Sequence, residues 1–468
     1  MKEQPFIPTD FKDLRLSKRA NSVLSTMILL GSAVVNRNFC NFAQKISAYR
    51  MMNNDKVTST SITNAYQRTC KEEIAAAKCK HVLCLQDTCE INYEAHSDRM
   101  HKKGRQPGIV SNKEAGCFLH ACMAINADTM LPFGFTYIKM WNRDKDAPGC
   151  KDRKYRQLDI TEKESFRWCE AIDTTESLLG EKQLVTLISD RESDIYDLLT
   201  KADKKTKFLI RSCRSRCIDG GKGYLHDKVR SIPSMGTYEF YVPASHGIMA
   251  RKAQMEVRFT QVEIDRPANR KKEDAPPTKI NCICVSEVQG TTPKGYEHIE
   301  WILLTNHEVK SVEDALRCVA WYRCRWFIEE LFRLLKRKGF RVEDIQLEEI
   351  PSIEKNILFA LYAALMSMTL KHVFNHSDDF VKIPATHCFT SGQVKAMKIL
   401  MPKIQGKTKK QQNPFPVGSL PWMAWGIARF GCWDCYTYKP GYTTFKSGLD
   451  KFAQMHIMYE AMKDVYNG

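Results

Sequence analysis

Two short apolar runs, each closed by an aspartate, narrow the folds that this chain can adopt. They are HVLCLQD at residues 81–87 and LVTLISD at residues 184–190. A short apolar run that closes on a charge is typical of a buried β-strand. Between them lie two β-favourable runs, CFLHACMAINAD and PFGFTYIKMW, and a helical stretch that ends at Gly180. Three neighbouring strands, a helix and a further strand predict a mixed α/β sheet.

The length and texture of the chain predict several domains. Its 468 residues exceed what one ordinary core holds, so about two to four domains are expected. Residues 1–75 have a helical pattern, residues 206–304 are rich in β-favourable runs, and helical patterns dominate from residue 305 onward.

The charge of the chain favours a polyanionic partner. Lys and Arg number 71 against 54 Asp and Glu, which gives a net charge of +17. A field of this sign concentrates polyanions, and nucleic acid is the commonest of them. An anionic membrane is the rival partner. Against it, the basic residues are spread along the whole chain and form no single polybasic amphipathic segment.

The sequence favours a cytoplasmic protein with no membrane partner. No apolar core follows the N-terminal charges, and the stretch VLSTMILLGSAVV has 13 residues, too few to span a bilayer. The 18 cysteines are scattered and often sit in apolar runs, as reduced cysteines do. The CWDC at residues 432–435 has the spacing of half a zinc site, but no second half accompanies it.

A polar stripe runs along an otherwise apolar helix predicted over YRCRWFIEELFRLLK at residues 322–336. With Tyr322 at zero, Arg325 lies about 60°, Glu329 about 20° and Lys336 about 40° to the same side. Apolar side chains cover the opposite and adjoining face. One interpretation is a solvated face with an Arg325–Glu329 pair, which contributes a few tenths of a kcal/mol. Another is a functional edge of a buried helix.

Three carboxylates favour the functional interpretation. Asp87 and Asp190 close the two apolar runs, where either one alone is more often a turn or helix-cap residue. Together with Glu329 they offer three hard oxygen ligands of the kind that Mg²⁺ or Mn²⁺ accepts. Two such ions activate the attacking oxygen and stabilise the leaving oxygen in phosphodiester cleavage. Nearby Arg and Lys side chains suit phosphates.

The spacing Tyr322-x₂-Arg325-x₃-Glu329-x₆-Lys336 resembles the YREK motif of cut-and-paste DNA transposases of the insertion sequence four family. The segments QDT at 86–88 and DRE at 190–192 are similar to the two aspartate segments of that family. The 139 residues from Asp190 to Glu329 suit its β-rich insertion inside a ribonuclease-H-like core. The resemblance extends over nearly the whole chain.

The resemblance implies a role for each motif residue. It implies that Asp87, Asp190 and Glu329 are catalytic and hold two Mg²⁺ ions, or Mn²⁺, at the site. The residues implied to contact DNA are Tyr322, Arg325 and Lys336 at phosphates, Trp301 against a flipped base, and Arg211, Arg15 and Arg19. The N-terminal residues belong to FKDLRLSKRA, which is similar to the opening helix of the family.

The resemblance also implies an architecture. The expected domains are a helical DNA-binding domain at 1–75, a ribonuclease-H-like catalytic core at 76–205 and 305–370, a β-rich insertion at 206–304, and a helical dimerisation domain at 371–468. The last of these has twelve Lys and Arg against four acids after residue 380. That charge would otherwise only aid solubility.

The implied activity is cut-and-paste transposition by a nucleoid-associated bacterial protein. Water would cleave one strand at a transposon end and free a 3′-hydroxyl. That hydroxyl would attack the opposite strand to make a hairpin, which a second water would reopen. The freed 3′-hydroxyl would then join target DNA. The implied partners are double-stranded terminal inverted repeats, target DNA and a second copy of the chain. Two alternatives are a nuclease of the same fold without strand transfer and a non-catalytic DNA-binding derivative. A tyrosine recombinase is disfavoured by the carboxylates.

Overall fold

The computed structural model describes residues 11, 13–39, 41–100, 107–145, 158–201, 206–244, 249–267, 277–336 and 339–467. Part of the N-terminal domain predicted for residues 1–75, namely residues 1–10, 12 and 40, therefore lies outside the described residues. The described part of that domain is helical, as predicted. It contains α1 (Leu14–Leu30), α2 (Val35–Asn38), α3 (Phe42–Met52) and α4 (Ser59–Ala76).

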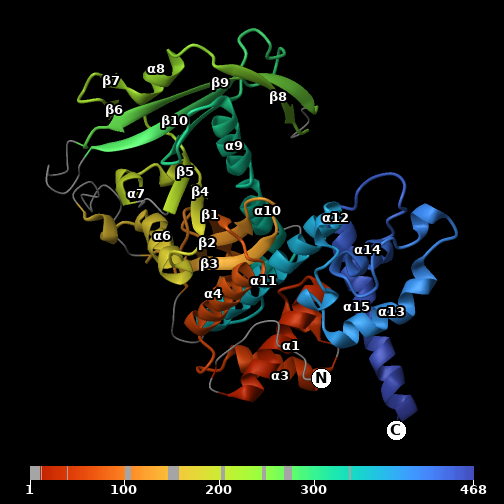
Figure 1. The fold of residues 1–468 in the computed structure, drawn as a ribbon. Helices are drawn as coiled ribbons and strands as arrows, with labels where there is room; N and C mark the ends of the chain where they lie inside the picture. Colours follow the sequence, from red (N-terminus) through yellow and green to blue (C-terminus); the bar gives the residue numbers. More distant parts are fainter. Residues whose placement is uncertain are drawn as a thin grey trace.

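A large mixed sheet follows, and it confirms the predicted α/β class (Figure 1). Its strands are β1 (His81–Asn92), β2 (Gly116–Asn126), β3 (Pro132–Trp141), β4 (Leu184–Ser189), β5 (Thr206–Arg211), β6 (Cys217–Ile218), β7 (Gly223–Tyr224), β8 (Gly236–Val242), β9 (Arg251–Ile264), β10 (Thr278–Glu287) and β11 (Glu300–Thr305). The helices among and after them are α5 (Ser97–Met100), α6 (Phe166–Leu179), α7 (Tyr196–Lys201), α8 (Leu225–Arg230), α9 (Val312–Arg323), α10 (Trp326–Leu335), α11 (Ile350–Asn375), α12 (Ser377–Phe380), α13 (Ser391–Ile404), α14 (Leu420–Phe430) and α15 (Tyr442–Asn467).

The order of strands places the two predicted aspartate strands side by side. Along the sheet the order is β3-β2-β1-β4-β5-β11-β10-β9-β6-β7, with β8 on β9. Strands β1, β4 and β5 are parallel, whereas β2 and β3 continue antiparallel from β1. Strand β11 pairs antiparallel with β5, so residues 206–304 contribute strands to the same continuous sheet.

The prediction that Asp87 ends its strand is wrong. Strand β1 continues to Asn92, because β2 pairs with it along its whole length as far as Asn92↔Gly116. The neighbour on the other side, β4, stops at Ser189, so only β4 ends on its predicted aspartate. Asp87 therefore lies on the part of β1 that extends beyond its parallel neighbour.

The two faces of the sheet belong to two apolar cores. In β1, Leu83 and Leu85 join the core shared with α10, α11 and α1, whereas Val82 and Cys84 join the core shared with α6. This alternation is the two-residue period of a strand. Trp168 of α6 is fully buried in the second core. The sheet is thus covered by helices on both faces around β1.

Helix α11 is the central helix of the first core. It contacts α1, α3 and α4 from the N-terminal part, α10, and α14 and α15 from the C-terminal part. Its length and composition would let it cross a membrane, but 89% of its most apolar window is buried inside the protein. This burial is what a core helix of a soluble protein shows.

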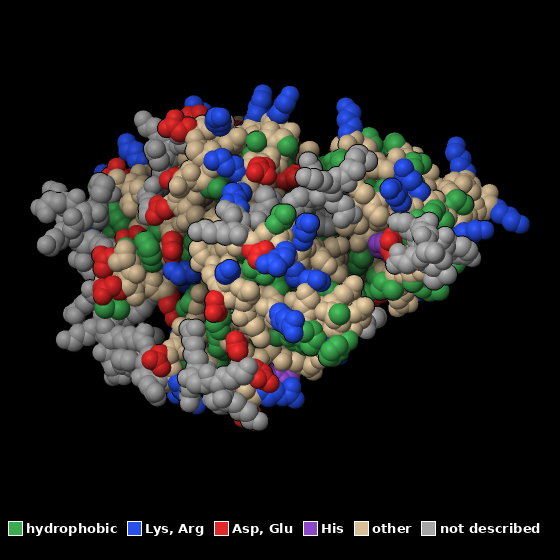
Figure 2. All heavy atoms as spheres, turned by 90° about the horizontal axis from the view of Figure 1, so that it is seen from below, with side chains coloured by type: hydrophobic (Ala, Val, Ile, Leu, Met, Phe, Trp, Pro, Cys, Tyr) green, Lys and Arg blue, Asp and Glu red, His purple; other side chains and the backbone are tan. Residues whose placement is uncertain are grey.

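The C-terminal helices form one end of the molecule, on the right in Figure 1. After α13 ends at Ile404, the connection to α14 contains one turn of 3-10 helix, Lys409–Gln411. The last helix is α15, whose end projects from the body (Figure 1). Figure 2 shows Lys and Arg side chains standing out from the same right-hand end.

Candidate active site

Strand alternation turns both predicted aspartates toward the helices α9 to α11. Leu85 of β1 and Ile188 of β4 belong to the core on that face. Asp87 and Asp190 each lie two residues further along and therefore face the same way. The last paired residues of the two strands are Leu85 and Ile188. The register thus brings Asp87 level with Asp190 just beyond the end of β4.

Backbone hydrogen bonds hold the two carboxylates in different ways. The Thr88 N–H donates to Oδ1 of Asp87 at 2.7 Å. Asp190 caps a short 3-10 helix at residues 191–193, and the Glu192 N–H donates to its Oδ1 at 2.9 Å. Each aspartate keeps an oxygen that these backbone bonds leave unused.

The predicted single helix over residues 322–336 is interrupted, so that prediction is wrong. Helix α9 ends at Arg323 and α10 begins at Trp326. Between them the backbone tightens, since the N–H groups of Cys324 and Arg325 donate three residues back, to Trp321 and Tyr322. Such tightening is the 3-10 pattern of hydrogen bonding. It separates Tyr322 from the α10 residues that follow.

Glu329 projects from the first turn of α10, which packs on β1. The Arg325 side chain forms an ion pair with Glu329 and another with Oδ2 of Asp87, the latter at 3.2 Å. Arg325 and Asp87 are each only 18% exposed. The guanidinium therefore lies between a carboxylate from β1 and a carboxylate from α10, and links the two elements.

The ionisation of these groups reflects burial and crowding of like charges. Burial and then the charge of Asp190 raise the pKa of Asp87 to about 7, against the opposing hydrogen bond from Thr88 and charge of Arg325. Burial also raises the pKa of Glu329, which Arg325 opposes. Burial tends to lower the pKa of Arg325, but Tyr322, Glu329 and Asp87 together hold it above its ordinary value. The site holds more negative charge than one arginine neutralises.

Three more predicted residues adjoin the carboxylates. Tyr322 is buried, and burial raises its pKa while the nearby cations Arg325 and Arg211 oppose the rise. Arg211, at the end of β5, donates to the Glu300 carbonyl at 3.2 Å. The Trp301 ring lies edge-on to the Tyr322 ring, with centroids 5.7 Å apart. Trp301 is half-buried and also packs edge-on against Phe240.

Lys336 directly follows α10 and lies near the C-terminal end of β1. Its Nζ forms an ion pair with Glu343 at 3.1 Å, and the same Glu343 accepts a hydrogen bond from the Asn92 N–H at the end of β1. The structure therefore brings Lys336 to the C-terminal end of the strand that carries Asp87. It contacts neither of the two aspartates in the interactions found among the described residues.

Arg15 and Arg19 lie on α1, apart from the carboxylates. Arg15 has a side chain that is 91% exposed and that pairs with the neighbouring Asp13. Helix α1 packs on α11, α15 and α3. The structure thus places these two predicted DNA contacts on the helical part of the molecule and not beside β1 and β4.

Sequence reasoning missed a network behind the two aspartates. Arg167 of α6 donates through Nε to Thr88 Oγ1 at 3.0 Å and pairs through Nη2 with Glu192 at 2.6 Å. Thr88 also bonds His120 Nδ1 at 2.8 Å. Arg167 thereby joins the residue after Asp87 to the segment after Asp190. It sits in an ordinary amphipathic helix, and no motif marks it.

Trp326 was also missed. It follows Arg325 directly and is 66% exposed, which is unusual for so large an apolar side chain. The sequence could have indicated this exposure, because the spacing of residues on α10 puts Trp326 opposite the apolar side of the helix.

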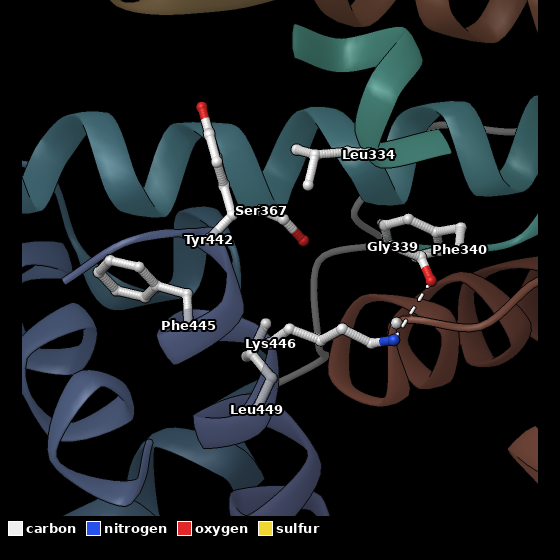
Figure 3. A pocket seen from close by; sticks show the side chains of 9 residues that line it. Leu334, Gly339, Phe340, Ser367, Tyr442, Phe445, Lys446 and Leu449 are labelled. Carbon is white, nitrogen blue, oxygen red and sulfur yellow. Dashed lines mark hydrogen bonds between the residues drawn. The ribbon is translucent and has the colours of Figure 1, made fainter. Parts of the chain in front are cut away.

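The cavity drawn in Figure 3 is separate from the carboxylates. It lies among the C-terminal end of α10, α11, α15 and the end of α1, and has a volume of about 20 Å³. Lys446 crosses its wall and donates to the Gly339 carbonyl at 3.2 Å. A mostly apolar space of this size holds at most a single water molecule. It is a packing defect, not a substrate site.

The carboxylate set fits a divalent cation in its chemistry. Three carboxylates supply hard oxygen ligands, and like charges raise the pKa of Asp87 where a cation would relieve the repulsion. With the side chains as they stand, no group of three or more His, Cys, Asp or Glu within the described ranges is gathered to hold one ion. Arg325 lies between two of the three carboxylates instead. No protein-family model matches the chain.

Proposed function

We propose that the protein is a DNA transposase, which cleaves DNA at transposon ends and joins the freed 3′-hydroxyl to target DNA. The observation that carries the proposal is that Arg325 pairs with Asp87 of β1 and Glu329 of α10, while Asp190, directly after β4, lies near enough for its charge to raise the pKa of both. Asp87 and Asp190 are more than 100 positions apart in the sequence, and so are Asp190 and Glu329. Distant acids rarely converge on a half-buried site without a functional cause, because their mutual repulsion is unfavourable.

The order of strands supports a ribonuclease-H-like core. Strands β3, β2, β1, β4 and β5 are adjacent in that order; β2 is antiparallel to both of its neighbours, β1 and β3, whereas β4 and β5 are parallel to β1. This is the arrangement expected of the ribonuclease-H-like sheet. The resemblance is one of fold alone, so the function rests on the site.

Asp87, Asp190 and Glu329 are the residues that would hold Mg²⁺ or Mn²⁺, two ions per site. When bound, such ions supply activation of the attacking oxygen and stabilisation of the leaving oxygen. Arg325 would then turn from Asp87 and Glu329 toward a phosphate. Its buried Nε has no hydrogen-bond partner among the described residues and remains available as a donor.

The other side chains suit a DNA strand that passes the carboxylates. Arg211 and Lys336 carry positive charge and would contact phosphates, while the Arg325 guanidinium lies over the Tyr322 ring. Trp301 packs on Tyr322 and offers an aromatic face for a base taken out of the duplex. Arg15 and Arg19 would contact DNA at the separate helical part.

A homodimer that bridges two DNA ends is part of the proposal. Large apolar side chains on the projecting half of α15 are exposed: Met455, Ile457, Met458 and Met462. Exposed apolar side chains gathered on one helix are typical of a contact surface. They suit a second copy of the chain.

The test compares two neighbouring glutamates of α10. Glu329→Gln should abolish Mg²⁺-dependent cleavage of a duplex that carries the terminal sequences of the element, while binding of that duplex is retained. Glu330→Gln is the matched control, because Glu330 is a half-buried glutamate of the same helix that pairs with Arg333 and not with Arg325. Cleavage by the Glu329→Gln protein would refute the assigned site.

Strand joining separates the proposal from its rivals. A pre-cut duplex with a free 3′-hydroxyl should be joined to a supercoiled plasmid. Cleavage without joining would indicate a nuclease, and binding without either reaction would indicate a non-catalytic DNA-binding derivative.

A further inference from the structure

The segment at residues 381–449 is unusually one-sided in charge. It contains nine lysines and one arginine but a single acid, Asp434. Even that acid is engaged locally, since the N–H groups of Tyr436 and Thr437 donate to its Oδ1 at 2.9 and 3.1 Å. The segment therefore contains too few acidic side chains to neutralise its lysines and arginine.

Six exposed lysines of this segment follow one another along α13 and the loop after it. We define them as the lysine surface: Lys395, Lys398, Lys403, Lys407, Lys409 and Lys410. At about 100° per residue, the three on α13 fall on its outer side, opposite Met397 and Met401. Those two methionines are buried, and α13 packs on α14. The right-hand end of Figure 2 shows such blue side chains with few red ones among them.

The lysine surface lacks the acidic partners that lysines have elsewhere in the molecule. Lys139, Lys252 and Lys310 pair with Glu170, Glu239 and Glu308. Within the described part of the chain, none of the six lysines forms an ion pair. Like charges held together without counter-charges repel one another. An anionic partner would remove that repulsion.

The loop that carries Lys407, Lys409 and Lys410 is held in a closed shape. The Gly406 N–H donates to the Gln411 carbonyl at 3.1 Å, and the Gln411 N–H donates to the Thr408 carbonyl at 2.9 Å. Arg429 of α14 donates through Nε to the Ile404 carbonyl at 3.1 Å. The one arginine of the segment thus fastens the loop, while the three lysine side chains of the loop are exposed. An ordered loop loses less conformational entropy on binding.

Two exposed tyrosines border the same loop. Tyr436 is 51% exposed, its hydroxyl bonds Thr408, and Lys410 Nζ lies 5.5 Å from its ring centroid. Tyr438 is 64% exposed on the same connecting segment. Lysines beside exposed aromatic side chains are typical of nucleic-acid surfaces, where the hydroxyls also contact phosphates.

We propose that the lysine surface binds the backbone of duplex DNA without regard to sequence, at a site separate from the carboxylates. Lysine is a point charge without the planar fork of arginine, so it holds phosphates but does not read bases in bidentate fashion. This inference goes beyond the proposed function and stands even without catalysis. In a transposase, such a surface would hold target DNA, which has no fixed sequence.

An anionic membrane fits the lysine surface less well than DNA. A helix that lies on a membrane needs a broad apolar face toward the lipid. Helix α13 instead turns its apolar side chains toward α14, and Ile399 is its one large apolar side chain that is exposed.

The experiment measures binding of the full chain to a duplex of scrambled sequence at several salt concentrations. The test variant is Lys407→Gln/Lys409→Gln/Lys410→Gln, and the control is Lys182→Gln/Lys222→Gln/Lys294→Gln, which removes the same charge from exposed positions elsewhere. Losing three phosphate contacts should lower the slope of log affinity against log salt by about 2.7. Affinity near physiological salt should fall by about tenfold or more. Equal melting temperatures check folding.

Several results would overturn the proposal. They are an unchanged affinity and slope in the test variant, an equal loss in the control variant, or a loss confined to one particular sequence. Binding to anionic phospholipid vesicles that depends on these three lysines, with DNA binding unchanged, would assign the surface to membranes. The Glu329→Gln protein should keep the full salt slope, so this test is independent of the test of catalysis.

Discussion

The two ends of strands β1 and β4 both carry buried polar side chains, but these side chains have different kinds of partner at each end. At one end, His81 and His307 both bond the Thr186 hydroxyl, at 2.7 and 2.8 Å, beneath Trp321 of α9. At the other end, Asp87 meets Arg325 of the next helix, α10. His81, Thr186, Asp87 and Asp190 all lie on the same face of the sheet by strand alternation.

The difference lies in how buried polar groups are neutralised. Burial lowers the pKa of His81 to about 4 and that of His307 to about 3, so both rings are neutral at pH 7 and share one hydroxyl. At the carboxylate end, burial and like charge raise the pKa of Asp87 to about 7, and the Arg325 cation offsets part of that repulsion. The polar groups of the histidine end are thus uncharged and bonded to one another, whereas those of the carboxylate end are ionisable and balanced by Arg325 alone among the contacts described above.

The largest effect should come from Asp87→Asn. If the proposed site is correct, cleavage should fall by at least about a thousandfold, because the substitution removes one of its three oxygen ligands. Stability should change by no more than about 1 kcal/mol, because the lost pair with Arg325 is offset by relief of repulsion with Asp190. Cleavage assays and urea unfolding measure the two quantities. Asp128→Asn, an exposed aspartate after β2, is the control and should leave cleavage unchanged.

At the histidine end, Thr186→Val should lower the stability of the protein and leave its cleavage activity nearly unchanged, which is the reverse of the result expected for Asp87→Asn. The substitution keeps the shape but leaves two ring nitrogens without their shared partner, at a cost of about 2–3 kcal/mol in the free energy of unfolding. Specific cleavage activity of the folded protein should stay within about twofold of normal, since Thr186 contacts no catalytic group. Thr174→Val, on the surface of α6, should cost much less. A large loss of activity in the Thr186→Val protein would break the comparison.

Acid should weaken the histidine end. Both histidines have folded-state pKa values below the value of about 6.5 in the unfolded chain, so the unfolded state binds more protons as pH falls. Stability is full above pH 6.5 and should fall toward pH 4, by about 1 kcal/mol per histidine at pH 5.5 after allowance for partial exposure. Urea unfolding at several pH values measures this. His81→Gln should make the free energy of unfolding less dependent on pH. An unchanged dependence on pH would show that His81 is not one of the groups responsible.

The smallest effect should come from Arg325→Gln in protein without metal. Loss of the cation between Asp87 and Glu329 should cost about 1–2 kcal/mol, since the pair is only partly buried. Added Mn²⁺ should then raise the melting temperature more in this variant than in the normal protein. Arg333→Gln removes an exposed pair of the same helix and should show neither change. Equal responses to Mn²⁺ would show that Arg325 does not balance the carboxylates.

Local patterns in the sequence predicted the elements better than their junctions. The apolar runs before Asp87 and Asp190 were enough to predict two buried strands, because burial on both faces leaves a continuous apolar run, but not that the two strands are adjacent. The extension of β1 past Asp87 could not be predicted, since it depends on pairing with β2. The break at Cys324 was hidden too, because its backbone stays close to helical values.

The candidate site was predictable in its acids but not in its contacts. Spacing and residue type singled out Asp87, Asp190, Glu329 and Arg325. Two further facts depend on tertiary packing alone: Arg325 reaches across to Asp87, and Arg167 ties the two aspartate segments together. The bridge between His81 and His307 joins residues 226 positions apart and left no motif.

The central position of α11 limits how the chain can be shortened. Because helices from both ends of the chain cover it, a fragment that stops before α13 would expose the apolar side of α11 to water. Expression of such a fragment should therefore yield aggregated material. Any shortened version of this protein has to retain α14 and the part of α15 that packs on α11, whatever else those helices bind.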